Sequence, residues 1–169
     1  MKKTITLILA FLLLCFGLSA CTDLKNNNDD NDGDGGNENS SPTTAANILV
    51  AYFSCTGNTE NIAKMIARET GGALHEIQPQ IPYTEADLDY YSGGRADREQ
   101  ADPAARPAIA NSVENMPDYD VIFLGYPIWH VQAPKIIYTF LESYDFAGKT
   151  IVPFCTSGSS GVGSSADNL

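Results

Sequence analysis

In the C-terminal part of the chain, short apolar runs alternate with segments whose apolar residues recur at helical spacing. Residues 47–54, "NILVAYFS", are almost continuously apolar, which is typical of a strand buried on both faces of a parallel sheet. Residues 119–128 form a second such run, and residues 73–79 form a shorter one. A fourth predicted strand, 149–158, contains Pro153 and is therefore expected at a sheet edge or an irregular position.

Two helices are predicted between these strands. The first follows strand 47–54 and ends at the glycine pair that begins with Gly71. The second covers residues 133–146 and has Pro134 in its first turn. Segment 80–118 is polar and rich in proline and glycine, which predicts a long excursion with one helix around residues 84–101. This alternation of strands and helices predicts an α/β fold built on a doubly wound parallel sheet.

Doubly wound sheets bind ligands at the carboxyl ends of their strands, so the loop after the first strand is a candidate site. This loop, "SCTGNT" (54–59), supplies three hydroxyl groups, a permissive glycine and the first N–H groups of a helix, which together form an anion site. It contains no lysine or arginine and does not match the G-x-x-x-x-G-K-[ST] pattern. A phosphate held by neutral donors suits a ligand that stays bound better than a phosphoryl group in transfer.

A cysteine phosphatase is the rival interpretation of this loop, because Cys55 follows the first strand as a nucleophile would. The low-molecular-weight tyrosine phosphatases, which the segment superficially resembles, also need an arginine six residues after the cysteine. That position is Asn61 here. Without the guanidinium neither the thiolate nor the transition state is stabilised, so we expect Cys55 to be a small residue at a strand end.

Three segments together resemble the flavodoxins. "FSCTGNTENIA" (53–63), "FLGYPIWH" (123–130) and "PFCTSGSSGVG" (153–163) look like the phosphate loop and the second and third flavin loops of that family, in the family's order. The resemblance implies a flavodoxin-like doubly wound parallel sheet of order 2-1-3-4-5 with FMN as cofactor. The cofactor-binding residues it implies are Ser54, Thr56, Gly57, Asn58, Thr59, Pro127, Ile128, Trp129, His130, Thr156, Ser157 and Gly158.

Within this implied set, the residues from the first loop cradle the phosphate of FMN. Trp129 stacks on the flavin ring, and Thr156, Ser157 and Gly158 close its opposite side. A surface role is the simpler interpretation of His130, to which no catalytic role is assigned. No residue is predicted to be catalytic, and no metal site is predicted in the folded part of the chain.

The end of the chain resembles the first turn of the helix that follows the fourth strand. Ser164 or Ser165 would be its N-terminal cap. We therefore expect residues 47–169 to form a flavodoxin-like domain that is incomplete at its C-terminus, with strand five and the last helix missing.

The N-terminus has the features of an export signal over residues 1–20, a basic start followed by an apolar stretch. It ends in "LSAC", which resembles the bacterial lipoprotein cleavage box and implies that Cys21 is lipidated and anchors the exported protein to the bacterial cell membrane. An ordinary signal peptide with a chance cysteine is the alternative. Residues 21–46 form a low-complexity tether of Asn, Asp, Gly and Ser that has little to bury.

The acidic residues and the net charge limit the kinds of partner that the protein is expected to bind. Asp30, Asp32 and Asp34 match the opening of a calcium loop, but Ser41 replaces its bidentate glutamate, so a solvated acidic spacer is favoured. From Asn47 onward, 15 acidic residues outnumber 7 basic ones. No basic stripe exists to attract nucleic acid, and membrane contact is expected only through the lipid.

These observations predict an FMN-binding electron-transfer protein that exchanges electrons with a redox partner protein or a small-molecule acceptor. An acidic domain disfavours the negative charge of reduced flavin, which points towards a low reduction potential. Two alternatives stay open. One is an FMN-dependent oxidoreductase acting on NAD(P)H or quinones, and the other is a truncated, non-catalytic surface lipoprotein that has lost its flavin.

Overall fold

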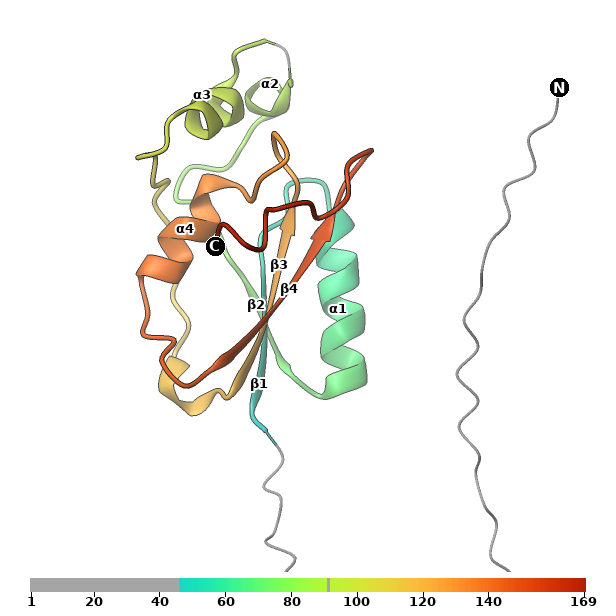
Figure 1. The fold of residues 1–169 in the computed structure, drawn as a ribbon, viewed down its shortest axis with the longest axis vertical. Coiled ribbons are helices and arrows are strands. Elements are labelled where there is room, and N and C mark those ends of the chain that lie inside the picture. Colours follow the sequence, from blue (N-terminus) through green and yellow to red (C-terminus); the bar gives the residue numbers. More distant parts are fainter. Residues whose placement is uncertain (1–45, 91) are drawn as a thin grey trace, which may run out of the picture. The chain divides into compact units, whose positions relative to one another are not determined.

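The computed structural model describes residues 46–90 and 92–169, which contain a four-stranded parallel sheet (Figure 1). Its strands are β1 (Ile48–Tyr52), β2 (Ala73–Glu76), β3 (Val121–Pro127) and β4 (Thr150–Thr156). They lie in the order β2-β1-β3-β4, which confirms the predicted fold class and strand order, with β4 at the edge as Pro153 indicated. The predicted export signal 1–20, Cys21 and all of tether 21–46 but its last residue lie outside the described residues.

Two helices cover opposite faces of the sheet (Figure 1). The first, α1 (Asn58–Thr70), packs on the face that carries Val50 and Tyr52, through Ala63. The second, α4 (Lys135–Glu142), packs on the other face. Successive residues of a strand point to opposite faces, so a fully apolar strand is needed when both faces are covered. This requirement explains the continuous apolar runs in β1 and β3.

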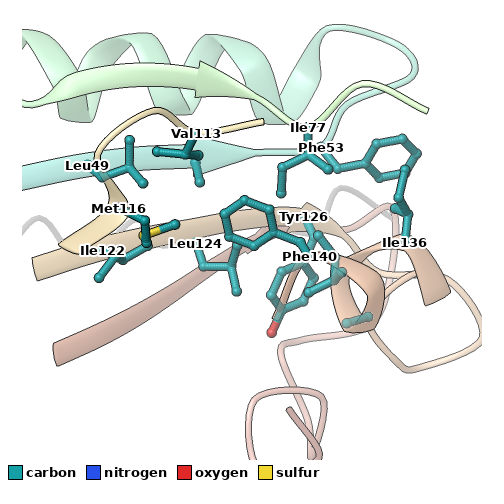
Figure 2. Close-up of a cluster of buried hydrophobic side chains, with 13 residues drawn as sticks. Leu49, Phe53, Ile77, Val113, Met116, Ile122, Leu124, Tyr126, Ile136 and Phe140 are labelled. Atoms are coloured by element: carbon teal, nitrogen blue, oxygen red, sulfur yellow. The ribbon is translucent and has the colours of Figure 1, made fainter. Parts of the chain in front are cut away.

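The larger core lies between the sheet and α4, as Figure 2 shows. Alternate residues of β1 and β3 meet the apolar side of α4, and Val113 and Met116 close the end of the cluster. Replacing one of these large side chains by alanine typically costs about 2–5 kcal/mol. The buried members of this core are Leu49, Ala51, Phe53, Ile77, Val113, Met116, Ile122, Leu124, Tyr126, Ala133, Ile136, Ile137 and Phe140.

A glycine in β3 permits a close approach on the α1 face. Gly125 is the register partner of Phe154 in β4. A Cβ atom on Gly125 would lie 2.2 Å from the ring of Phe154, so any larger residue would displace that ring. The ring of Phe154 on edge strand β4 can therefore lie over Gly125 of β3 without distortion.

The excursion between β2 and β3 differs from the prediction of one helix over 84–101. It contains two short helices, α2 (Glu85–Leu88) and α3 (Arg95–Ala101). Thr84 begins α2 with a capping box, in which its hydroxyl oxygen accepts the N–H of Asp87. Gly93 between the two helices has φ 67°, a left-handed conformation that ends any continuous helix.

Two other local predictions were wrong, and one short element was not predicted. Helix α4 is shorter than 133–146, and Pro134 is its N-cap in an extended conformation rather than a first-turn residue. Residues 163–168 form successive turns rather than the start of a helix. Ser165 is fully buried there, and its hydroxyl donates to the carbonyl of Val162 instead of capping. A short 3-10 helix, η1 (Met116–Asp118), was not predicted. None of the helices between residues 46 and 169 is both long and apolar enough to span a bilayer.

Candidate functional site

Three loops meet where β1, β3 and β4 end, and helices α2 and α3 lie beyond this same end of the sheet (Figure 1). The first loop leads from β1 into α1. Gly57 is the N-cap of α1 and has a φ of 81°. The turn into the helix requires this backbone conformation, and a residue with a side chain would be strained in it. The N–H of Gly57 donates to Ser54 Oγ over 3.1 Å, and Asn58 Nδ2 donates to Thr56 Oγ1 over 3.2 Å. The first N–H groups of α1 have no partner within the helix, so this end attracts an anion.

Thr59 joins the first loop to the third. Its side chain is buried in the first turn of α1, with 1% exposed. The Oγ1 atoms of Thr59 and Thr156 lie 2.8 Å apart in a hydrogen bond. Thr156 is the last residue of β4, so this bond fixes the start of the third loop against the first.

Trp129, in the second loop, is held in an aromatic cluster. Its ring packs edge-to-face against Phe53, with centroids 5.5 Å apart, and against Tyr83, with centroids 5.3 Å apart. Tyr83 comes from the excursion and donates its phenol proton to Glu99. Burial and this carboxylate raise the pKa of Tyr83, so the phenol stays neutral. The ring orientation of Trp129 is therefore fixed by residues from two other segments.

The turn after Trp129 is strained. The backbone N–H groups of Trp129 and Gln132 each donate to the other's carbonyl over 2.9 Å, which closes a two-residue turn. Its central residues, His130 and Val131, have φ 48° and 64°. Such turns normally use asparagine and glycine, because a β-branched side chain disfavours positive φ. Backbone strain of this kind persists only where the surroundings enforce it.

Among the cavities at these loops, one lies beside the first and second loops and one beside the second and third, and these two share Tyr90 and His130. The first has a volume of about 190 Å³ and lies between the first two loops and the excursion. Its lining is Ser54, Cys55, Thr56, Thr59, Leu88, Tyr90, Ala96, Asp97, Pro127, Trp129 and His130. The second has a volume of about 530 Å³ and lies between the second and third loops. Its lining is Tyr90, Ile128, His130, Val131, Ser157, Gly158, Ser159 and Ser160.

Nine of the twelve predicted site residues therefore lie on one cavity or the other. The remaining three are Gly57, Asn58 and Thr156, which hold the loops in shape through the turn and the hydrogen bonds described above. The sequence interpretation missed the wall supplied by the excursion, namely Leu88, Tyr90, Ala96 and Asp97. No local pattern marks these residues, because only the tertiary fold brings the excursion over the strand ends.

Cys55 does not have the properties of a nucleophile. Although Cys55 is an exposed residue, desolvation by the protein atoms around its sulfur raises the thiol pKa to about 12; Arg95 acts to lower this pKa and Glu76 to raise it. The thiolate is therefore scarce near neutral pH, which agrees with the absence of an arginine at Asn61. Within residues 46–90 and 92–169, no three His, Cys, Asp or Glu side chains are grouped as a metal site would need.

A sequence model of the flavodoxins matches residues 47–169, the whole of the predicted domain. The chain belongs to the flavodoxin family. This membership confirms the resemblance to the flavodoxins. No functionally curated protein matches the chain.

Solved structures of flavodoxin-type proteins share the fold. A proposed flavoprotein from Bacteroides eggerthii is 50% identical, with a TM-score of 0.72, over 73% of this chain and 79% of that one. Another from Bacteroides uniformis is 48% identical, with a TM-score of 0.68, over 70% of this chain and 77% of that one. A flavoprotein from Lactobacillus acidophilus, solved in complex with FMN, is 25% identical, with a TM-score of 0.60, over 69% of this chain and 78% of that one.

Proposed function

We propose that this flavodoxin binds FMN across the three loops and uses it to transfer electrons. Family membership and the FMN complex of the Lactobacillus acidophilus flavoprotein support the cofactor. The observation that carries the proposal is the convergence of the first and third loops, joined by the bond between Thr59 and Thr156. A phosphate fits the first loop, where hydroxyl groups and the N-terminus of α1 supply neutral donors.

The remaining residues fit a flat, partly apolar ring. His130 on the second loop lines the second cavity together with Ser157 and Gly158 on the third, and Trp129 lines the first cavity beside it. The loop hydroxyl and backbone groups suit the polar edge of such a ring, while Trp129 suits its face. Bound FMN supplies one- and two-electron redox chemistry, and the protein orients it and sets its electrostatics. The excess of acidic residues in the domain favours a low reduction potential.

The experiment that tests this function is flavin loading of the purified protein. Adding FMN should give the visible absorbance of a bound flavin at one equivalent, and chemical reductant should bleach it reversibly. A carrier passes these electrons to a redox protein without turning over a small substrate. A protein that takes up no FMN under any loading condition would instead support the non-catalytic surface lipoprotein.

A reductase of small acceptors such as quinones is the second candidate. It is favoured by the wall that the excursion adds to the first cavity, where Leu88 and Tyr90 offer apolar and aromatic surface beside the flavin loops. Steady-state oxidation of NADH or NADPH with a quinone, dependent on FMN, would establish this activity. Rapid flavin reoxidation by a carrier protein with no quinone turnover would favour electron transfer.

We propose further that the protein is exported and anchored through a lipid on Cys21. The basic start, the apolar stretch and the "LSAC" box support this location. Acyl chains contribute about 0.8 kcal/mol per buried methylene, so they hold a soluble domain at a bilayer through the acidic tether. Cys21→Ala should abolish signal processing and release the protein from the membrane fraction. Unchanged processing and fractionation of this variant would contradict the anchor.

A further inference from the structure

Helix α3 holds the second loop through two side chains on the same helical face. Asp97 and Gln100 are three residues apart, a spacing that places them side by side on a helix. Asp97 reaches the tip of the strained turn, and Gln100 reaches its base. The excursion therefore contacts the segment that carries Trp129 at two separate points.

Gln100 uses its amide fully in this contact. Its Nε2 donates to the carbonyls of Trp129 over 3.1 Å and Ala133 over 3.2 Å. Its Oε1 accepts the backbone N–H of Lys135 over 3.0 Å. Lys135 is the first residue of α4, whose N-cap is a proline that offers no capping side chain. Gln100 thus caps α4 from another element and fixes the residues on both sides of the turn.

Asp97 restrains the part of the turn that is strained. Its Oδ1 lies 2.8 Å from His130 Nε2, and its Oδ2 accepts the backbone N–H of Gly93 over 3.1 Å. Asp97 is mostly covered, with 16% of its side chain exposed, whereas 40% of His130 is exposed. The positive φ of His130 is a conformation that needs support from outside the turn, and this contact supplies it.

We propose that α3 is a clamp for the second loop, with Gln100 as the positioning residue that sets the geometry of Trp129. The long segment between β2 and β3 would then be part of the site and not an accessory to it. The effect on Trp129 stands on the contacts of this chain alone. The consequence for bound flavin rests on the proposed function.

The test uses the fluorescence of Trp129, which is the only tryptophan in the sequence. In the protein without FMN, Gln100→Ala should shift the emission to longer wavelength and increase quenching by acrylamide at least twofold. Gln80→Ala, at an exposed glutamine in the same excursion, is the matched control and should leave both unchanged. Far-UV circular dichroism verifies that each variant is folded.

Conservative variants separate positioning from a general loss of structure. Gln100→Glu keeps the acceptor for Lys135 and removes the two donors, so it should reproduce the change in Trp129 emission and serves if Gln100→Ala does not fold. Asp97→Asn keeps an acceptor for His130, so its Trp129 emission and quenching should resemble those of wild type. Those of Asp97→Ala should not. Folded Gln100→Ala and Gln100→Glu proteins with wild-type emission and quenching would overturn the clamp.

The same variants loaded with FMN extend the test. The visible circular dichroism of the flavin should change in Gln100→Glu and remain unchanged in Gln80→Ala. Failure of the wild-type protein to take up FMN would refute the proposed function, and the emission of Trp129 would still decide on the clamp. Flavin spectra that are identical in all variants would show that α3 does not act on the cofactor.

Discussion

Thr59 and Thr156 share a hydrogen bond of 2.8 Å between their hydroxyl oxygens, although 97 residues separate them along the chain. The bond connects the first turn of α1 to the last residue of β4. Neither residue could be paired with the other from the sequence, because only the β2-β1-β3-β4 order brings the two strand ends to one edge. This contact makes two loops behave as one binding surface.

Replacing Thr59 with valine keeps the shape of the side chain and removes the hydroxyl. Because Thr59 is buried and bonded to Thr156, we expect FMN affinity to fall roughly 10- to 100-fold, the range for a lost hydrogen bond near a charged ligand. Titration with FMN measures the change. Thr150→Val at the opposite end of β4 is the control, and equal affinities for the two variants would remove Thr59 from the site.

Cys55→Ser should leave FMN affinity within about twofold of wild type, since the thiol contributes no charge. The raised pKa of about 12 also predicts slow alkylation by iodoacetamide at pH 8, far slower than that of a free cysteine with an ordinary pKa. The alkylation rate should rise about tenfold per pH unit above pH 8 and level off only near pH 12. Fast alkylation at neutral pH, or hydrolysis of an aryl phosphate that Cys55→Ser abolishes, would restore the phosphatase interpretation.

Val131→Gly should stabilise the protein, because glycine adopts φ 64° without the penalty that a β-branched residue carries. The gain is expected to be about 1 kcal/mol, after the entropy of the more flexible unfolded chain is subtracted. Urea unfolding of the protein without FMN measures it. Val162→Gly replaces an exposed valine without positive φ and should give no gain. A loss of stability in Val131→Gly would mean that the turn is not strained.

The side chain of His75 should make the stability of the protein depend on pH. Its Nε2 is buried and has no hydrogen-bond partner among the described residues, and burial lowers its pKa below 6.5 although Glu76 acts in the opposite direction. The unfolded chain therefore binds a proton more readily than the folded protein as the pH falls below 6.5. This contribution to stability is complete above that pH and is lost on acidification.

Urea unfolding at pH 7.5 and pH 5.5 measures this effect. His75→Leu should lose less stability than wild type between the two values, because it has no imidazole to protonate. Gln80→Ala, at the exposed glutamine, should keep the wild-type difference, since it leaves His75 in place. Equal pH dependence in wild type and His75→Leu would show that His75 titrates normally.

The sequence predicted the sheet and most of the loop residues that line the two cavities, because both depend on local patterns. Continuous apolar runs identified β1 and β3, and the loop residues after each strand supplied nine of the cavity residues. The sequence patterns failed where tertiary contacts determine the local structure. The glycine at position 93 divided the predicted helix 84–101, and Tyr90 and Asp97 reach the site only because the excursion folds over it. Hydrogen bonds such as those of Gln100 leave no periodic signal.

Comparison of FMN with riboflavin tests the central claim most directly. The two ligands share the ring and differ in the phosphate that the first loop is proposed to hold. Titration of the protein without flavin, followed by quenching of Trp129 fluorescence, should give saturable binding of one FMN that is at least about 100-fold tighter than binding of riboflavin. Equal affinities for the two ligands, or no quenching by FMN, would contradict the assignment of the three loops as a flavin site.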